Sequence, residues 1–321
     1  MFFMEDLSFL IQSLKMAGIQ YNENEPMAHK TTFKVGGTAD LYIIPKTIDQ
    51  FRGAVSASKS QECKFFILGG GSNVVFPDTN YEGIVISTSN LNNIICTDDE
   101  VEDINENEVL VTCEAGTTMA AFVNFCTNHN FTGAEQFAGL PGTIGGAVFM
   151  NARCFDKSIS DILYSTEHFE LLPHGRSNFF NLPFDPKLWD YKKSPFQQQE
   201  RYITSATFRL TRANAEQHEQ IEKDCKKYIS ERVDKGHFKY PSAGSVFKNN
   251  HDFGAPSGKI IDNAGLRGTT IGGAQIAPFH GNFIININHA TADDIKALVE
   301  FTKSKVKELY GFELETEIIF V

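Results

Sequence analysis

Short apolar runs bounded by glycine or polar residues recur through the first two-thirds of the chain. Runs of four to eight such residues, rich in Val, Ile, Phe and Tyr, are typical of buried β-strands. Helical candidates lie between them, including residues 119–126. The pattern favours an α+β arrangement over a regular βαβ array, with strands expected at 41–44, 65–68, 83–86, 109–111 and 203–210.

Helical spacing of apolar residues marks both ends of the chain. A short amphipathic helix is expected within residues 1–28, where Leu7, Leu10, Ile11, Leu14 and Met16 precede Gly18. Near the C-terminus, Thr291 and Asp294 form a capping box and Gly311 is a C-terminal signal. The helix between them is expected to pack in the core through Ile295, Leu298, Val299, Thr302, Val306 and Leu309.

A polar stretch at 212–217 separates the strand-rich part of the chain from another helix, so we place a domain boundary near residue 211. The predicted organisation has an N-terminal helix in 1–28 and a C-terminal domain over 212–321. Between them we expect a domain over 29–211, composed of two subdomains at about 29–88 and 89–211.

Charge and composition narrow the possible functions of these 321 residues. The net charge of −11 excludes a broad basic surface for nucleic acid. The six cysteines form no C-x-x-C pair, and no H-x-x-x-H or H-E-x-x-H occurs, so neither a disulfide framework nor a metal is expected. The N-terminus meets acidic residues before any basic region, and no apolar run could span a bilayer, which predicts a cytoplasmic protein.

Two glycine-rich segments are the strongest candidates for ligand binding. The first, Gly69-Gly70-Gly71-Ser72-Asn73, directly follows the strand predicted at 65–68 and resembles a pyrophosphate cradle. A tight turn would explain it equally well, and the G-x-G-x-x-G fingerprint is absent. The second, 133–152, combines five glycines with Pro141 and small apolar residues. Such a backbone is expected to lie directly against a large cofactor.

The sequence G-L-P-G-T-I-G-G-A at 139–147, followed by M-N-A at 150–152, resembles the flavin-binding signature of the UDP-N-acetylenolpyruvoylglucosamine reductase (MurB) family. The segments T-T-F-K-V-G-G-T-A-D and Y-P-S-A-G-S-V-F-K-N are also similar to family motifs. Family order continues to the end of the chain, through matches at 31–40, 240–249, 265–268, 271–275, 280–283 and 314–318.

The resemblance implies a two-part FAD-binding domain of the vanillyl-alcohol-oxidase type over 29–211 and a C-terminal α+β substrate domain over 212–321. It implies reduction of UDP-N-acetylglucosamine enolpyruvate to UDP-N-acetylmuramate, with NADPH as hydride source and noncovalent FAD as relay. No obligate protein partner is expected. The implied cofactor-binding residues are Gly69, Gly70, Gly71, Ser72, Asn73, Pro141, Gly142, Thr143, Gly145, Gly146, Ala147 and Asn151.

The resemblance also implies the catalytic groups. Ser245 is expected to donate the proton, and Glu317 to interact with the developing acid-enolate. The family carries arginine in Y-R-x-S where this chain has Lys192, so either Lys192 acts alone or an arginine assists from elsewhere, with Arg153, Arg201 and Arg267 as candidates.

The implied substrate-binding residues are Tyr191, Lys235, Asn249 and His280, although Lys235 is followed by Gly236-His237 where the family has Gln-Pro. Two alternatives remain open. One is an FAD-dependent oxidase of the same fold, which would not require Ser245 together with Glu317. The other is a flavin-binding module without turnover, to which the lysine at 192 gives some weight.

Overall fold

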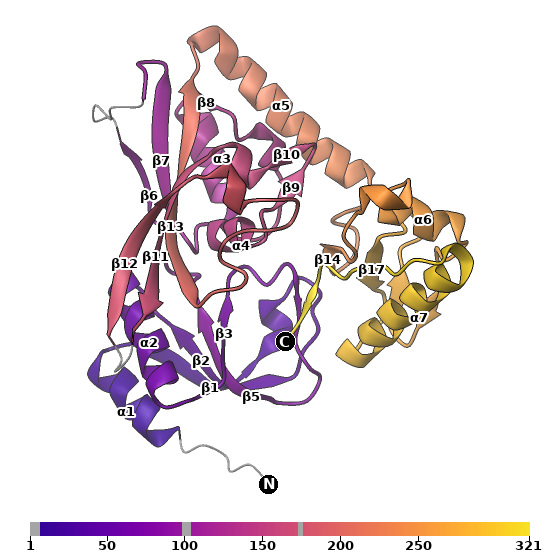
Figure 1. The fold of residues 1–321 in the computed structure, drawn as a ribbon, viewed down its shortest axis with the longest axis horizontal. Helices are drawn as coiled ribbons and strands as arrows, with labels where there is room; N and C mark the ends of the chain where they lie inside the picture. The colour runs from indigo at the N-terminus through magenta and orange to yellow at the C-terminus, as the bar shows by residue number, and fades with distance from the viewer. Residues whose placement is uncertain (1–6, 98–103, 173–175) are drawn as a thin grey trace. The chain divides into compact units, whose positions relative to one another are not determined.

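The computed structural model describes residues 7–97, 104–172 and 176–321 (Figure 1). The acidic N-terminus that contributes to the prediction of a cytoplasmic protein lies in residues 1–6, outside this range. The chain forms two compact units, and segments of the two alternate along the sequence. The first contains the chain up to residue 22, 41–70 and 83–230; the second contains 23–40, 71–82 and 231–321.

This division differs from the boundary expected near residue 211. The last change of unit falls between Ser230 and Glu231, inside helix α5 (Ala215–Asp234). Two segments from the N-terminal half, 23–40 and 71–82, belong to the second unit. The first glycine-rich loop is therefore split, because Gly70 belongs to one unit and Gly71 to the other.

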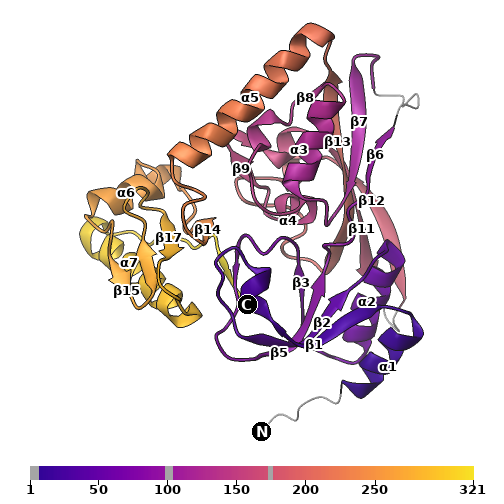
Figure 2. The same ribbon diagram turned by 180° about the vertical axis from the view of Figure 1, so that it is seen from behind.

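The larger sheet of the first unit has the order β12-β11-β13-β7-β6, with β8 paired to β13. The buried core beside this sheet contains the aromatic rings of Phe122 and Phe208, whose centroids are 4.7 Å apart. Helices α3 (Met119–Asn128) and α4 (Ile144–Phe149) cover one face, as Figures 1 and 2 show from opposite sides. The strands are β6 (Ile94–Thr97), β7 (Glu108–Glu114), β8 (Phe131–Thr132), β11 (Leu163–Leu171), β12 (Ser177–Pro183) and β13 (Arg201–Arg212).

A four-stranded sheet has the order β1-β2-β5-β3, and β3 runs parallel to β5. Helices α1 (Ser8–Met16) and α2 (Ile48–Ser60) contact each other. The backbone N–H of Gln50 donates to the Thr47 hydroxyl at 3.1 Å, which caps α2. The strands are β1 (Gln20–Pro26), β2 (Thr38–Ile44), β3 (Phe65–Leu68) and β5 (Tyr81–Ser87), and a small hairpin pairs β9 (Arg153–Cys154) with β10 (Lys157–Ser158).

The second unit has a four-stranded sheet in the order β14-β17-β16-β15. Its core explains why the two N-terminal segments belong to it, because Phe33 and Val75 are buried together with Phe247 and Leu314. The elements are β4 (Val74–Val75), β14 (Ser242–Ser245), α6 (Ser257–Asn263), β15 (Thr270–Ile271), β16 (Ala274–Ile276), β17 (Phe283–Asn286), α7 (Ala292–Tyr310) and β18 (Ile319–Phe320), which pairs parallel with β4. Among the described helices, none combines the length and apolar composition needed to cross a bilayer.

The start of α7 supports a stability prediction. The Thr291 hydroxyl accepts a hydrogen bond from the Asp294 N–H at 3.0 Å, and the Asp294 carboxylate accepts the Thr291 N–H at 3.0 Å. We expect Thr291→Ala to lower the free energy of unfolding by about 1 kcal/mol, because it leaves an orphan N–H at the helix start. Denaturant unfolding measures this, with Lys296→Ala at an exposed position of α7 as control. Equal loss in both variants would contradict the assignment.

Candidate functional site

The parts of the two glycine-rich segments that belong to the first unit, 69–70 and 141–147, pack against each other. A Cβ atom at Gly69 would lie 2.5 Å from the Thr143 hydroxyl oxygen, and one at Gly70 would lie 2.7 Å from the Gly142 Cα. The contact at Gly70 is with backbone, so glycine is required there, whereas a side chain at Gly69 would force the Thr143 side chain to move. The fold thus brings together Gly69, Gly70 and the 141–147 segment, which are separated by about seventy residues of sequence.

Backbone hydrogen bonds fix the 141–147 segment on the rest of the first unit. The N–H of Ile144 donates to the Thr117 carbonyl at 2.8 Å, and the N–H of Gly145 donates to the Ala115 carbonyl at 2.8 Å. Ala147 is buried in α4, whereas Pro141 is exposed in the preceding turn. The segment is therefore rigidly held while its turn stays accessible.

Two features of this segment fit a bound cofactor. The Thr143 hydroxyl is buried, yet it has no hydrogen-bond partner within the described part of the chain. At exposed Gly146 the nearest atom to an added Cβ would be that same hydroxyl, at 3.6 Å, so protein packing alone does not require glycine there. An orphan donor beside a small, accessible backbone position suits a cofactor with phosphate or carbonyl oxygens.

The end of α4 holds the loop that carries Tyr191 and Lys192. Asn151 is buried and donates its side-chain N–H to the Asp190 carbonyl at 2.9 Å. The Ser194 hydroxyl donates to the Phe149 carbonyl at 2.7 Å. Lys192 adopts a left-handed backbone conformation, φ 57°, and its carbonyl accepts from the Gln197 amide at 3.0 Å. The Asn151 amide, predicted to bind the cofactor, is thus engaged in anchoring this loop.

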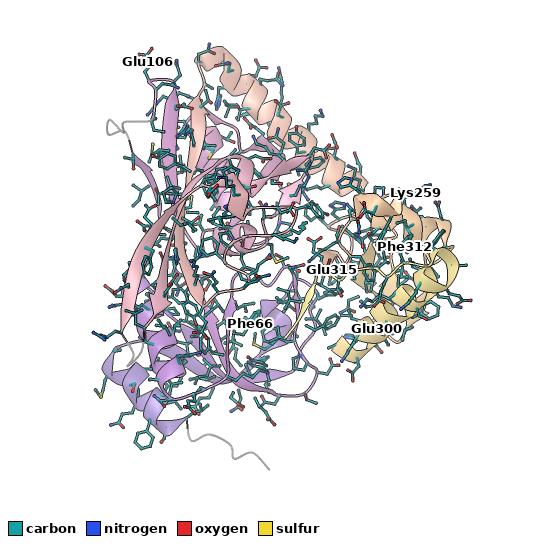
Figure 3. All side chains as sticks on the ribbon, in the orientation of Figure 1. Phe66, Glu106, Lys259, Glu300, Phe312 and Glu315 are labelled. Atoms are coloured by element: carbon teal, nitrogen blue, oxygen red, sulfur yellow. The ribbon has the colours of Figure 1, made fainter. Side chains whose placement is uncertain are left out.

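The second unit contains a polar pocket that includes Ser245, at the end of β14. Asn249 and His280, both predicted to bind substrate, also line it. Sequence patterns had not singled out Lys259 or Asp262, because isolated charged residues give no spacing signal; Lys259 on α6 is labelled in Figure 3. The complete lining is Ser245, Asn249, Pro256, Gly258, Lys259, Asp262, Arg267, His280, Gly281 and Asn282.

Of the three arginines considered as helpers for Lys192, only Arg267 lines this pocket. Its guanidinium pairs with the Asp262 carboxylate through two nitrogens. Arg201 instead donates to Glu170 at 2.8 Å in the sheet of the first unit. The Arg153 guanidinium lies 3.5 Å from the Asp156 carboxylate. Arg267 is therefore the candidate that shares a pocket with the proposed proton donor.

His280 and Asn249 both make contacts that fix the pocket wall. Burial lowers the pKa of His280, so its ring is neutral at neutral pH. Its Nδ1 accepts the Asn282 N–H at 3.1 Å. The Asn249 side-chain oxygen accepts the Ser257 N–H at 2.9 Å, at the start of α6. The pocket thus presents neutral donors and acceptors together with the cations Lys259 and Arg267 and the Asp262 carboxylate that pairs with Arg267.

Lys235 is not among the pocket-lining residues. Its ammonium lies 3.5 Å from Glu231 at the end of α5. The following Gly236 has φ 78°, and a side chain there would meet the Phe279 ring at 2.9 Å. The His237 ring packs on Phe283 with centroids 4.7 Å apart, and burial lowers its pKa to about 4. Gly236 and His237, which replace the Gln-Pro of the family, therefore both pack against aromatic rings of the second unit.

Ser245 and Glu317 are brought together through the backbone of the second unit. The Glu317 N–H donates to the carbonyl of Val246, the residue after Ser245, at 2.7 Å. The Asn73 side chain donates to the Glu317 carbonyl at 3.0 Å. Ser72 lies in the same loop, and the Gly71 carbonyl accepts the Thr32 N–H at 3.0 Å. The predicted proton donor, carboxylate and loop amide therefore lie on neighbouring segments.

Two protein-family models match separate parts of this chain. Residues 39–167 match the family model of the FAD binding domain, so the chain is a flavoprotein of that class, and its predicted two-part α+β fold is confirmed. Residues 236–321 match the model of the UDP-N-acetylenolpyruvoylglucosamine reductase C-terminal domain. The chain belongs to the UDP-N-acetylenolpyruvoylglucosamine reductase family, as the sequence resemblance predicted, and is an FAD-dependent oxidoreductase.

Individual relatives support this membership across nearly the full chain. The reductase of Treponema denticola is 42% identical, covering 92% of each chain. The reductase of Treponema pallidum is 36% identical, again over 92% of each chain. The crystal structure of the Thermus caldophilus reductase superposes with a TM-score of 0.70 at 27% identity, covering 94% of this chain and 98% of that one.

Proposed function

We propose that this protein is a cytoplasmic, NADPH-dependent reductase that converts UDP-N-acetylglucosamine enolpyruvate into UDP-N-acetylmuramate for peptidoglycan synthesis, and thereby serves cell-wall growth and division. The observation that carries the proposal is the pocket of the second unit. It presents Ser245, the cation Lys259 and the Arg267–Asp262 ion pair, and a backbone hydrogen bond joins the Glu317 segment to the strand of Ser245. This pocket lies in the part of the chain that matches the reductase C-terminal domain.

When bound, FAD supplies the relay that carries hydride from NADPH to the enolpyruvyl double bond. We assign its binding to Gly69, Gly70 and the 141–147 segment of the first unit. The unpartnered hydroxyl of Thr143 is available as a donor to an oxygen of the cofactor. Ser72, which the sequence also predicts to bind the cofactor, belongs to the second unit.

The chemistry of the substrate sets the roles of the remaining residues. Hydride addition to the terminal carbon leaves negative charge on the neighbouring carbon and on the carboxylate, so a cation stabilises the intermediate and an acid then protonates it. Ser245 donates the proton, which so weak an acid can do because the carbanion is strongly basic. Glu317 interacts with the developing acid-enolate, and Lys192 supplies the positive charge, with Arg267 as the alternative.

We assign substrate binding to Tyr191, Lys235, Asn249 and His280. Asn249 and His280 have the stronger support, because both line the pocket that contains Ser245. Burial lowers the pKa of His280 and so favours a neutral ring that acts through hydrogen bonds, whereas Lys259 adds a positive charge to the same wall. The substrate carries a negatively charged diphosphate and a carboxylate. Because the chain as a whole has a net charge of −11, the cations that bind these groups must be local to the site.

The cofactor assignment predicts that the purified protein is yellow and releases FAD when denatured by acid or heat. Release without proteolysis is expected because the assigned residues offer no covalent attachment chemistry. The released flavin is identified by absorbance and chromatography against FAD and FMN standards. Colourless protein that takes up no added FAD would contradict the proposed function, and flavin that stays with the denatured chain would contradict noncovalent binding.

A further inference from the structure

A continuous ladder of hydrogen bonds crosses the second unit beside its polar pocket. The Val246 N–H donates to the Asn282 carbonyl at 2.9 Å, and the Val246 carbonyl accepts the Glu317 N–H at 2.7 Å. On the far side of Glu317, its carbonyl accepts the Asn73 side-chain amide at 3.0 Å. The ladder thus runs from the pocket wall, past the residue after Ser245, to the first glycine-rich loop.

Amide side chains hold both edges of this ladder. Asn282 is buried and makes a reciprocal pair with the backbone of Phe247, accepting its N–H at 2.9 Å and donating to its carbonyl at 2.8 Å. Asn73 also uses both its side chain and its backbone, because its carbonyl accepts the Ile319 N–H at 2.9 Å. Residues 317 and 319 are therefore tied to Asn73 from both sides of Ile318.

The surroundings of Asn73 favour this bond over contact with a phosphate. The next residues, Val74 and Val75, pair with Ile319 and Phe320, and Val75 is part of the core that also contains Leu314 and Ile318. The segment after the loop is thus built into the second unit, whereas Gly69 and Gly70 belong to the first. The Asn73 amide donates to the Glu317 carbonyl within this unit.

We propose that Asn73 is a positioning residue for Glu317, rather than a ligand of the cofactor, and that Asn282 holds the Ser245 strand from the opposite edge. This inference rests on the proposed function for its catalytic consequence. Positioning matters because a displacement of about 1 Å can lower a rate about 100-fold. We call the hydrogen bond from the Asn73 side chain to the Glu317 carbonyl the Asn73 clamp. Without it, the Glu317 backbone keeps its bond to Val246 but loses the contact that orients it from the other side.

The decisive variant is Asn73→Asp, which keeps the shape of the side chain but replaces the donor with an acceptor facing the Glu317 carbonyl. The matched control is Asn286→Asp. The Asn286 amide likewise donates to a backbone carbonyl in the second unit, that of Phe33 at 3.1 Å, and Asn286 is not among the pocket-lining residues. Both variants thus acquire the same charge and lose the same kind of bond.

Hydrogen exchange of the full-length FAD-loaded protein tests the clamp without reference to activity. In Asn73→Asp, the amides of the 314–321 peptide are expected to exchange about tenfold faster, since one hydrogen bond is lost. FAD retained per chain after gel filtration should match the wild type. The Asn286→Asp control should leave exchange in this peptide unchanged. Unchanged exchange in Asn73→Asp would overturn the proposal.

Stopped-flow kinetics of the same proteins test the consequence for catalysis. Reoxidation of the flavin by the enolpyruvyl nucleotide should slow about 10-fold to 100-fold in Asn73→Asp, while flavin reduction by NADPH keeps its rate. Loss of FAD with normal reoxidation at saturating FAD would identify Asn73 as a cofactor ligand and overturn the proposal. If the wild type itself failed to turn over, the proposed function would fall, and the exchange data would still decide whether the clamp exists.

Discussion

Ser245→Ala is expected to slow reoxidation of the reduced flavin by the enolpyruvyl nucleotide about 10²-fold to 10⁴-fold, the usual contribution of a positioned general acid. The substitution removes the proton donor but leaves its strand in place, because the Val246 backbone still bonds to Asn282 and Glu317. Flavin reduction by NADPH should keep its rate, since no proton from Ser245 is needed there. Stopped-flow absorbance at the flavin band separates the two half-reactions.

The control for Ser245→Ala is Ser242→Ala, at the other end of β14 and outside the pocket lining. It should leave both half-reactions near their wild-type rates. Equal slowing of reduction and reoxidation in Ser245→Ala, or normal rates in both, would show that Ser245 has a structural role.

Lys192→Gln is expected to lower the reoxidation rate about 10²-fold to 10³-fold, the typical loss when one group that stabilises developing charge is removed. The affinity for substrate should fall much less, because the charge on the substrate carboxylate changes mainly as the transition state forms. Lys192→Arg should stay within a modest factor of the wild type only if the pocket is not shaped around the compact ammonium. Rates and substrate affinities come from the same stopped-flow experiment.

Lys193→Gln is the matched control for this variant, because Lys193 is the exposed neighbour whose ammonium lies 3.7 Å from Asp190. It should leave reoxidation unchanged. Unimpaired reoxidation in Lys192→Gln would sink the assignment of Lys192. Arg267→Gln would then be the next variant, since Arg267 shares the pocket with Ser245 whereas Arg153 and Arg201 do not line it.

Local sequence signals predicted the elements that have strong local causes. The strand at 65–68 and the helix between Thr291 and Gly311 occur as expected, because an all-apolar run and a capping box act through neighbouring residues. Helix α2 was not predicted. Its buried face includes Ala54 and Ser58, small residues that add little to an apolar pattern.

One sequence could not predict which distant segments pack together in the same unit. The segments 23–40 and 71–82 belong to the second unit because Phe33 and Val75 are buried with residues more than 160 positions away, and no local pattern records that pairing. Lys259 and Asp262 read as ordinary surface charges until the fold places them beside Ser245. Motif matching found Ser245 and Glu317, but only the backbone ladder shows how their segments are joined.

The proposed reductase activity is tested most directly by NADPH oxidation by the purified, FAD-loaded protein, followed at 340 nm with and without UDP-N-acetylglucosamine enolpyruvate under anaerobic conditions. We expect oxidation that requires the enolpyruvyl nucleotide and yields UDP-N-acetylmuramate in equal amount. Turnover that instead requires oxygen and an alcohol substrate would identify an oxidase. No turnover with either, from a protein that retains FAD, would identify a flavin-binding module, and each of these results would contradict the proposed function.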